Sequence, residues 1–205
     1  MTKICGVILA GGLARRMGGG DKSLNLLDGQ PILNHVISRL KPQVSAVALN
    51  ANGDAVRFSN YGLPVIADTE PDYPGPLAGI LAGMEWAKGQ GADHVVSVAA
   101  DTPFFPTDLV ERLNAKLSAS ARITIASTMD PTKGEMRHPT FALWPVDLAD
   151  DLRVALKGGT RKIVAWADQH GTANALFDFQ AYDPFFNINR PEDMVAAEQM
   201  IGATK

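Results

Sequence analysis

The chain has 205 residues, 46% of them hydrophobic and 20% charged, which is typical of one soluble globular domain with a sizeable core. Its formal net charge of −3 argues against broad nucleic-acid or membrane-surface binding, so an anionic ligand must be met by locally placed cations. The single cysteine, Cys5, cannot form an internal disulfide, and no apolar stretch approaches the length of a membrane span, so we expect a cytoplasmic protein.

The first predicted strand, residues 4–10, is a short apolar run stopped by glycine, as expected for a strand buried on both faces. Glycines and cations follow it in the order Gly11, Gly12, Arg15, Arg16 and Lys22. Because glycine lets backbone N–H groups approach an anion, this stretch indicates a polyphosphate-binding loop, with a solvated surface turn as the alternative. The dinucleotide fingerprint fails at Leu13 and Arg16, and the P-loop motif fails because Asp21 precedes the lysine.

Hydrophobic spacing predicts alternating elements over the first half of the chain. Helices are expected at 31–40, 55–60, 77–88 and 109–117, and strands at 44–49, 63–67 and 95–100. This alternation predicts a mostly parallel sheet with helices on both faces. In the second half, strands 122–127 and 138–144 flank a polar segment, 129–137, and are followed by helices at 147–156 and 162–170, a strand at 173–179 and a helix at about 189–201. We find no repeat or linker and expect a single domain, 1–205.

Polar or glycine residues follow four of the predicted strands: Gly11, Asn50, Asp68 and Asp101. Ligands of an open parallel sheet bind beyond the carboxyl ends of its strands, so these residues are expected to line one crevice. Asp101 is the natural magnesium ligand, because Mg²⁺ takes one or two carboxylates together with phosphate oxygens and waters. Asp68 is either a second metal ligand or an acceptor for a ribose or base. The alternative for each aspartate is a strand-end or helix-cap role.

Other polar and aromatic side chains permit more than one interpretation. His138 is either a general base or a structural histidine at a strand start. Trp86, Trp144 and Trp166 are expected to pack against other residues rather than to stack on a base. Asn187 and Asn189 are two residues apart and therefore present amides on one face of an extended segment, which suits recognition of a heterocycle edge. Turn or helix-cap duty is the alternative for Asn189.

A series of short motifs, taken together and in order, resembles one protein family over nearly the whole chain. The motifs are Leu9-Ala10-Gly11-Gly12, Arg15-Arg16-Met17-Gly18, Asp21-Lys22, Asn50-Ala51-Asn52, the Asp-Tyr-Pro-Gly-Pro-Leu-Ala-Gly stretch at 72–79, Asp101-Thr102-Pro103, His138-Pro139-Thr140 and Asn187-Ile188-Asn189. The combination resembles the molybdenum cofactor guanylyltransferases, a branch of the Rossmann-like nucleotidyltransferases. The Leu-Ala-Gly-Gly opening favours the guanylyl branch over cytidylyl relatives, and Gly20 departs from the larger residue that relatives often carry.

The resemblance implies a three-layer Rossmann-like fold in which residues 1–110 bind nucleotide and residues 111–205 bind the acceptor. The implied reaction transfers GMP from Mg-GTP to the terminal phosphate of molybdopterin and releases pyrophosphate. The implied nucleotide- and cofactor-binding residues are Leu9, Ala10, Gly11, Gly12, Lys22, Asn50, Asp68, Gly79, Asp101, Asn187 and Asn189, the last two facing the pterin. The implied catalytic residues are Lys22, Arg15, Arg16 and Asp101, which would carry Mg²⁺. The implied partners are GTP, molybdopterin, and molybdoenzyme-specific chaperones or insertion proteins, with neither nucleic acid nor membrane.

The implied chemistry agrees with the lack of an evident catalytic base. The attacking phosphate is already largely ionised at neutral pH, so catalysis requires positioning and charge neutralisation rather than proton removal. Two alternatives stay open on the sequence: a related cytidylyl or sugar-1-phosphate nucleotidyltransferase, and a non-catalytic nucleotide-dependent cofactor carrier.

Overall fold

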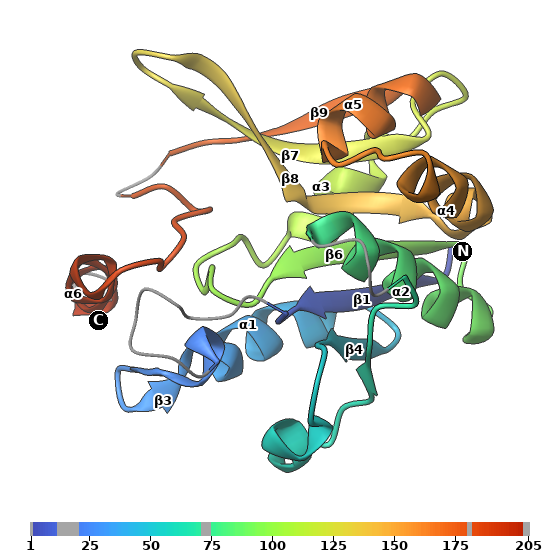
Figure 1. Ribbon diagram of the computed structural model, residues 1–205. Coiled ribbons are helices and arrows are strands. Elements are labelled where there is room, and N and C mark those ends of the chain that lie inside the picture. Colours follow the sequence, from blue (N-terminus) through green and yellow to red (C-terminus); the bar gives the residue numbers. More distant parts are fainter. Residues whose placement is uncertain (1, 12–20, 71–74, 180–181, 203–205) are drawn as a thin grey trace.

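The computed structural model describes residues 2–11, 21–70, 75–179 and 182–202, and most of the strands form one seven-stranded sheet (Figure 1). The sheet order is β5-β4-β1-β6-β8-β7-β9. The strands are β1 Ile4–Leu9, β4 Val47–Asn50, β5 Val65–Ile66, β6 His94–Ala99, β7 Ile123–Asp130, β8 Gly134–Pro145 and β9 Thr172–Phe177. A separate two-stranded hairpin, β2 Leu26–Leu27 with β3 Gln30–Pro31, turns at Asp28 and Gly29, both with positive φ.

The sheet is mostly parallel, as the alternation of elements predicts. Strands β5, β4, β1 and β6 run parallel to one another, and β7 runs parallel to β9. Only β8 runs the other way, lying antiparallel between β6 and β7. The carboxyl ends of β1, β4, β5 and β6 therefore meet along one edge of the sheet.

Helices cover both faces of the sheet and enclose two hydrophobic cores, which confirms the three-layer prediction. The helices are α1 Ile32–Leu40, α2 Pro76–Gly89, α3 Leu109–Asn114, α4 Ala149–Lys157, α5 Ile163–Ala167 and α6 Pro191–Gly202. Apolar residues of α1, α3 and α6 share one core, while those of α2, α4 and α5 share the other. Trp144 and Trp166 are fully buried in the second core and the partly buried Trp86 packs against it, which agrees with the predicted packing role.

Several elements differ from their predicted form. The polar segment 129–137 is mostly strand, because β7 continues through Asp130 and β8 already begins at Gly134. The Asp130 carboxylate accepts the backbone N–H groups of Thr132 and Lys133, and this closes a turn short enough for both strands to extend into polar sequence. The predicted helix 55–60 is a 3-10 helix, Ala55–Tyr61, and the predicted helix 109–117 ends at Asn114. Among the helices described, none has the length and apolar character to cross a bilayer.

Candidate active site

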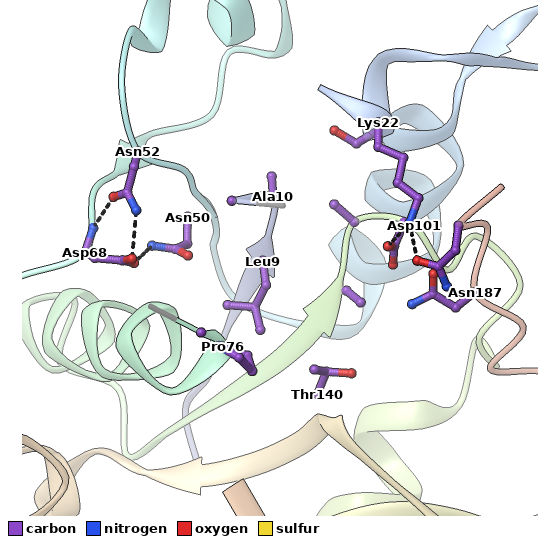
Figure 2. A pocket seen from close by; sticks show the side chains of 16 residues that line it. Leu9, Ala10, Lys22, Asn50, Asn52, Asp68, Pro76, Asp101, Thr140 and Asn187 are labelled. Atoms are coloured by element: carbon purple, nitrogen blue, oxygen red, sulfur yellow. Dashed lines mark hydrogen bonds and ion pairs between the residues drawn. The ribbon is translucent and has the colours of Figure 1, made fainter. Parts of the chain in front are cut away.

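A pocket of about 570 Å³ opens at the carboxyl ends of the parallel strands. Gly11 after β1, Asn50 at the end of β4, Asp68 after β5 and Asp101 after β6 all line it. Leu9 and Ala10 form its floor between two groups of polar side chains (Figure 2). The structure thus brings the four strand-end positions into the single crevice that the sequence predicts.

The pocket lies where the direction of chain winding reverses. From β1 the chain passes to β4 on one side, and it returns over α2 to β6 on the other side. The reversal separates the connections that follow β1 and β6, which leaves room for a ligand between them. Backbone bonds from Ala10 N–H to Asn50 O (2.8 Å) and from Ala100 N–H to Leu9 O (3.1 Å) hold the three strand ends together.

One wall of the pocket carries the lysine and a carboxylate in direct contact. Lys22 Nζ donates to Asp101 Oδ2 over 2.7 Å and to Asn189 Oδ1 over 2.5 Å. The two charged side chains are only 13% and 23% exposed, so this pair is shielded from solvent more than a typical surface ion pair. The ammonium group of Lys22 is thus held at the wall of the pocket, where it can compensate negative charge on a bound ligand.

The carboxyl-terminal segment is fixed to the same wall. Ile188 is fully buried, and its backbone N–H donates to the Asp101 carbonyl over 2.9 Å. Asn187 and Asn189 on either side of it both line the pocket. The Asn189 side chain does not cap α6. Its amide oxygen accepts a hydrogen bond from Lys22, while the Asp193 carboxylate accepts the backbone N–H groups of Asn189 and Arg190 just before the helix.

The opposite wall consists of amide side chains around Asp68. Asn50 Nδ2 donates to Asp68 Oδ1 over 2.9 Å, and Asn52 Nδ2 donates to Asp68 Oδ2 over 2.8 Å. Asn52 Oδ1 also accepts the backbone N–H of Asp68 over 2.9 Å, so the carboxylate is held from two sides (Figure 2). The wall with Asp101 lies across the pocket, which argues against one metal ion shared by both aspartates. In the described ranges no group of three or more His, Cys, Asp or Glu side chains is placed to hold a metal.

The remaining predicted residues fall outside the cavity or outside the described ranges. Gly79 belongs to α2 and does not line the pocket. It packs against Asn50, and a Cβ added at Gly79 would be 2.2 Å from Asn50 Oδ1. It therefore supports a lining residue by permitting close packing. Gly12, Arg15 and Arg16 lie outside the residues that the structure describes.

His138 has the environment of a structural residue rather than a catalytic base. Its Nε2 lies 2.8 Å from Thr128 Oγ1, and its ring stacks on Phe185 with ring centroids 4.4 Å apart. Burial lowers the pKa of His138 below its ordinary value, and the charge of Asp183 opposes this only in part. The histidine is not among the residues that line the pocket.

Among the lining residues that had no role assigned from sequence are Asn52 and Thr140. Asn52 stands in the same short motif as Asn50, and spacing of two in an extended segment could have indicated its participation. Thr140 reaches the pocket from β8, and its carbonyl accepts a hydrogen bond from Ser97 Oγ over 2.9 Å. No local pattern indicates that contact, because it depends on β8 pairing beside β6.

The sheet, its reversal point and a pocket with a lysine–carboxylate pair opposite a fixed aspartate define the class of Rossmann-like nucleotidyltransferases. Solved structures share this fold: molybdopterin-guanine dinucleotide biosynthesis protein A from Archaeoglobus fulgidus has a TM-score of 0.74 with 24% identity, covering 97% of this chain and 99% of the other. At that identity the likeness shows the fold alone.

Sequence comparisons define the family. The MobA-like NTP transferase domain matches residues 6–173. Molybdenum cofactor guanylyltransferase from Nitrobacter hamburgensis is 48% identical over 95% of this chain and 93% of its own length, and that from Mesorhizobium japonicum is 47% identical over 97% and 96%. The chain therefore belongs to the molybdenum cofactor guanylyltransferase family, within the MobA-like NTP transferases, and is a nucleotidyltransferase.

Proposed function

We propose that this chain transfers GMP from Mg-GTP to the terminal phosphate of molybdopterin, forming the guanine dinucleotide form of the cofactor. The names of the relatives support this reaction. The observation that carries it is the Lys22–Asp101 pair at the reversal point of a parallel sheet, facing a hydrogen-bonded aspartate across one pocket. A nucleoside triphosphate has a heterocycle and sugar at one end and concentrated negative charge at the other, which matches these two walls.

In this proposal the Lys22 and Asp101 wall takes the triphosphate. A single carboxylate suits Mg²⁺ when the remaining ligands are phosphate oxygens and waters, so the residues fit an ion that arrives with the nucleotide. The bound ion would supply charge neutralisation for the phosphates. Lys22 adds a fixed positive charge beside them, and Arg15 and Arg16 are proposed to act with it.

The opposite wall is proposed to hold the base or ribose. Each Asp68 oxygen accepts one amide hydrogen bond and has capacity for another, so N–H or O–H donors of guanosine could bind there. Leu9, Ala10, Gly11 and Gly12 complete the nucleotide site in this proposal. Asn50 participates directly, and Gly79 contributes by supporting it.

The acceptor is proposed to enter from the carboxyl-terminal half, residues 111–205. Asn187 and Asn189 would face the pterin, since both line the pocket beside Lys22. An acceptor phosphate oxygen attacks the α-phosphorus of GTP, a new P–O bond forms, and the bond to the leaving pyrophosphate breaks. The attacking oxygen is already ionised, so the step needs no general base, and no histidine is found among the described lining residues.

Cellular setting belongs to the same proposal. We propose that the enzyme acts in the cytoplasm and passes its product to molybdoenzyme-specific chaperones or insertion proteins. The free, buried Cys5 and the acidic net charge are compatible with that setting. Co-purification with apo-molybdoenzymes in the presence of GTP and molybdopterin would test the hand-over.

The reaction is tested by giving the purified protein GTP, Mg²⁺ and molybdopterin and measuring pyrophosphate. We expect release that requires both the acceptor and the metal, and that stops when EDTA is added. Parallel reactions with CTP and UTP are the matched controls for nucleotide choice. Faster release with CTP would favour the cytidylyl alternative, and tight GTP binding without turnover of a competent acceptor would favour a carrier.

A further inference from the structure

Arg57, which no site assignment above includes, joins the two walls of the pocket from outside. It belongs to the 3-10 helix Ala55–Tyr61, and its side chain is 27% exposed. Its Nε lies 2.5 Å from Asp21 Oδ2, in an ion pair that is not a straight hydrogen bond. Its Nη2 donates to the Asn52 carbonyl over 2.6 Å, and its Nη1 donates to the Asp54 carbonyl. Neither Arg57 nor Asp21 lines the pocket.

Each end of this bridge is connected to one wall. Asp21 directly precedes Lys22, and its carbonyl accepts the Leu24 N–H over 3.0 Å, which closes the short turn that carries the lysine. At the other end, Asn52 holds Asp68 by two hydrogen bonds. Polar contacts therefore connect Asp21, the residue before Lys22, through Arg57 to Asn52, whose side chain binds Asp68.

We propose that Arg57 is a positioning residue that sets the separation of the Lys22 wall and the Asp68 wall. A planar guanidinium holds several acceptors in a fixed mutual geometry, which the single ammonium of lysine cannot reproduce. A ligand that binds both walls at once gains from their being held at the right distance beforehand. A ligand that touches one wall gains little. The inference rests on the proposed function, because it takes GTP as the ligand that spans both walls.

The test compares ligands that reach both walls with ligands that reach one. GTP, guanosine and tripolyphosphate, each with Mg²⁺, are titrated calorimetrically into wild type, Arg57→Gln and Arg57→Lys. Because loss of one charge-assisted hydrogen bond corresponds to roughly a tenfold change in a binding constant, we expect GTP affinity to fall about tenfold in both variants. The affinities of guanosine and tripolyphosphate are expected to stay within about twofold. In turnover, the KM for GTP should rise while kcat changes little.

Arg122→Gln is the matched control. Arg122 also makes an ion pair with a carboxylate, Asp147, over 2.6 Å, but it directly precedes β7, near the amino-terminal end of β6, and lies away from the pocket. We expect a similar small loss of thermal stability with unchanged GTP affinity. Asp21→Asn tests the other partner of the ion pair. Its effect on GTP affinity and that of Arg57→Gln should be strongly non-additive, because both variants remove the same contact.

The outcomes separate this inference from the proposed function. Folded Arg57 and Asp21 variants that bind GTP as wild type does would overturn the positioning role. So would equal loss of affinity for all three ligands, because that pattern indicates general structural damage. A wild-type protein that binds no GTP would instead overturn the proposed function, and this inference would fall with it.

Discussion

At the residue scale, the pairing of Lys22 with Asp101 has the greatest chemical consequence. The pair is largely shielded, and Asn189 accepts a further hydrogen bond from the same ammonium. A shielded ion pair costs desolvation of both groups and is compensated only by good geometry. Its presence in a pocket is therefore better explained by ligand charge than by stability.

We expect Asp101→Asn to reduce pyrophosphate release about 100-fold or more, because the amide keeps an acceptor for Lys22 but removes the charge that Mg²⁺ needs. The fold should persist, as shown by an unchanged circular dichroism spectrum and a small shift in Tm. Asp108→Asn is the control, since Asp108 is half exposed and pairs only loosely with Arg112, at 3.8 Å. Wild-type turnover in Asp101→Asn would remove this carboxylate from the metal role.

At the element scale, α2 can approach the sheet closely because of two glycines one turn apart. A Cβ at Gly79 would lie 2.2 Å from Asn50 Oδ1, and a Cβ at Gly83 would lie 2.6 Å from Val7 Cγ1. Both neighbours are side chains of the sheet, but only Asn50 lines the pocket. Substitutions at the two positions can therefore distinguish an effect on helix packing from an effect on the geometry of the pocket.

We expect Gly79→Ala to displace Asn50, loosen its bond to Asp68 and raise the KM for GTP about tenfold. Gly83→Ala should lower the free energy of unfolding by about 1–3 kcal/mol with a much smaller effect on KM. Gly89→Ala has no neighbouring atom within 4 Å of the added Cβ and serves as the neutral control. Steady-state kinetics and urea denaturation measure the two effects. Equal KM values for the two buried alanine variants would contradict a specific link from Gly79 to the site.

Elements whose apolar residues repeat regularly could be predicted from sequence. Elements that depend on a turn hydrogen bond, or that are too short to show a repeat, could not. Predicted helices 31–40 and 77–88 correspond closely to α1 and α2, because their large apolar residues repeat at helical spacing in the sequence. The ends of β7 and β8 were not predicted, since Asp130 and its turn stabilise polar strand residues that alternate without an apolar face. The hairpin β2–β3 is too short to produce a periodic pattern.

At the scale of the whole molecule, we expect two partly buried histidines, His94 and His138, to make stability depend on pH. Burial lowers the pKa of both His138 and His94; nearby carboxylates oppose the shift at each, and Arg122 adds to it at His94. A histidine with a lowered pKa in the folded state takes up a proton more readily when the chain unfolds. The stabilisation is therefore fully present above the unfolded pKa, about 6.5, and is lost as the pH falls toward the lowered folded pKa.

We expect Tm to decline as the pH is lowered from 7 toward 5, and to decline less in His138→Gln, because glutamine takes up no proton on unfolding. His94→Gln should act in the same direction, and the double variant should have the flattest profile. Differential scanning calorimetry across this pH range measures the slopes. Parallel slopes for wild type and the double variant would show that other groups determine the acid sensitivity.

Sequence alone determined the family, the mostly parallel sheet and the strand-end positions Gly11, Asn50, Asp68 and Asp101 that share one pocket. It could do so because parallel strands place their carboxyl ends at one edge, so local patterns suffice to find that edge. Only the tertiary structure decided which polar groups meet there. Lys22 pairs with Asp101 and with Asn189, 167 residues away, while Asp68 is held by amides. Such contacts depend on the order of the strands and the docking of Ile188, which local periodicity does not encode.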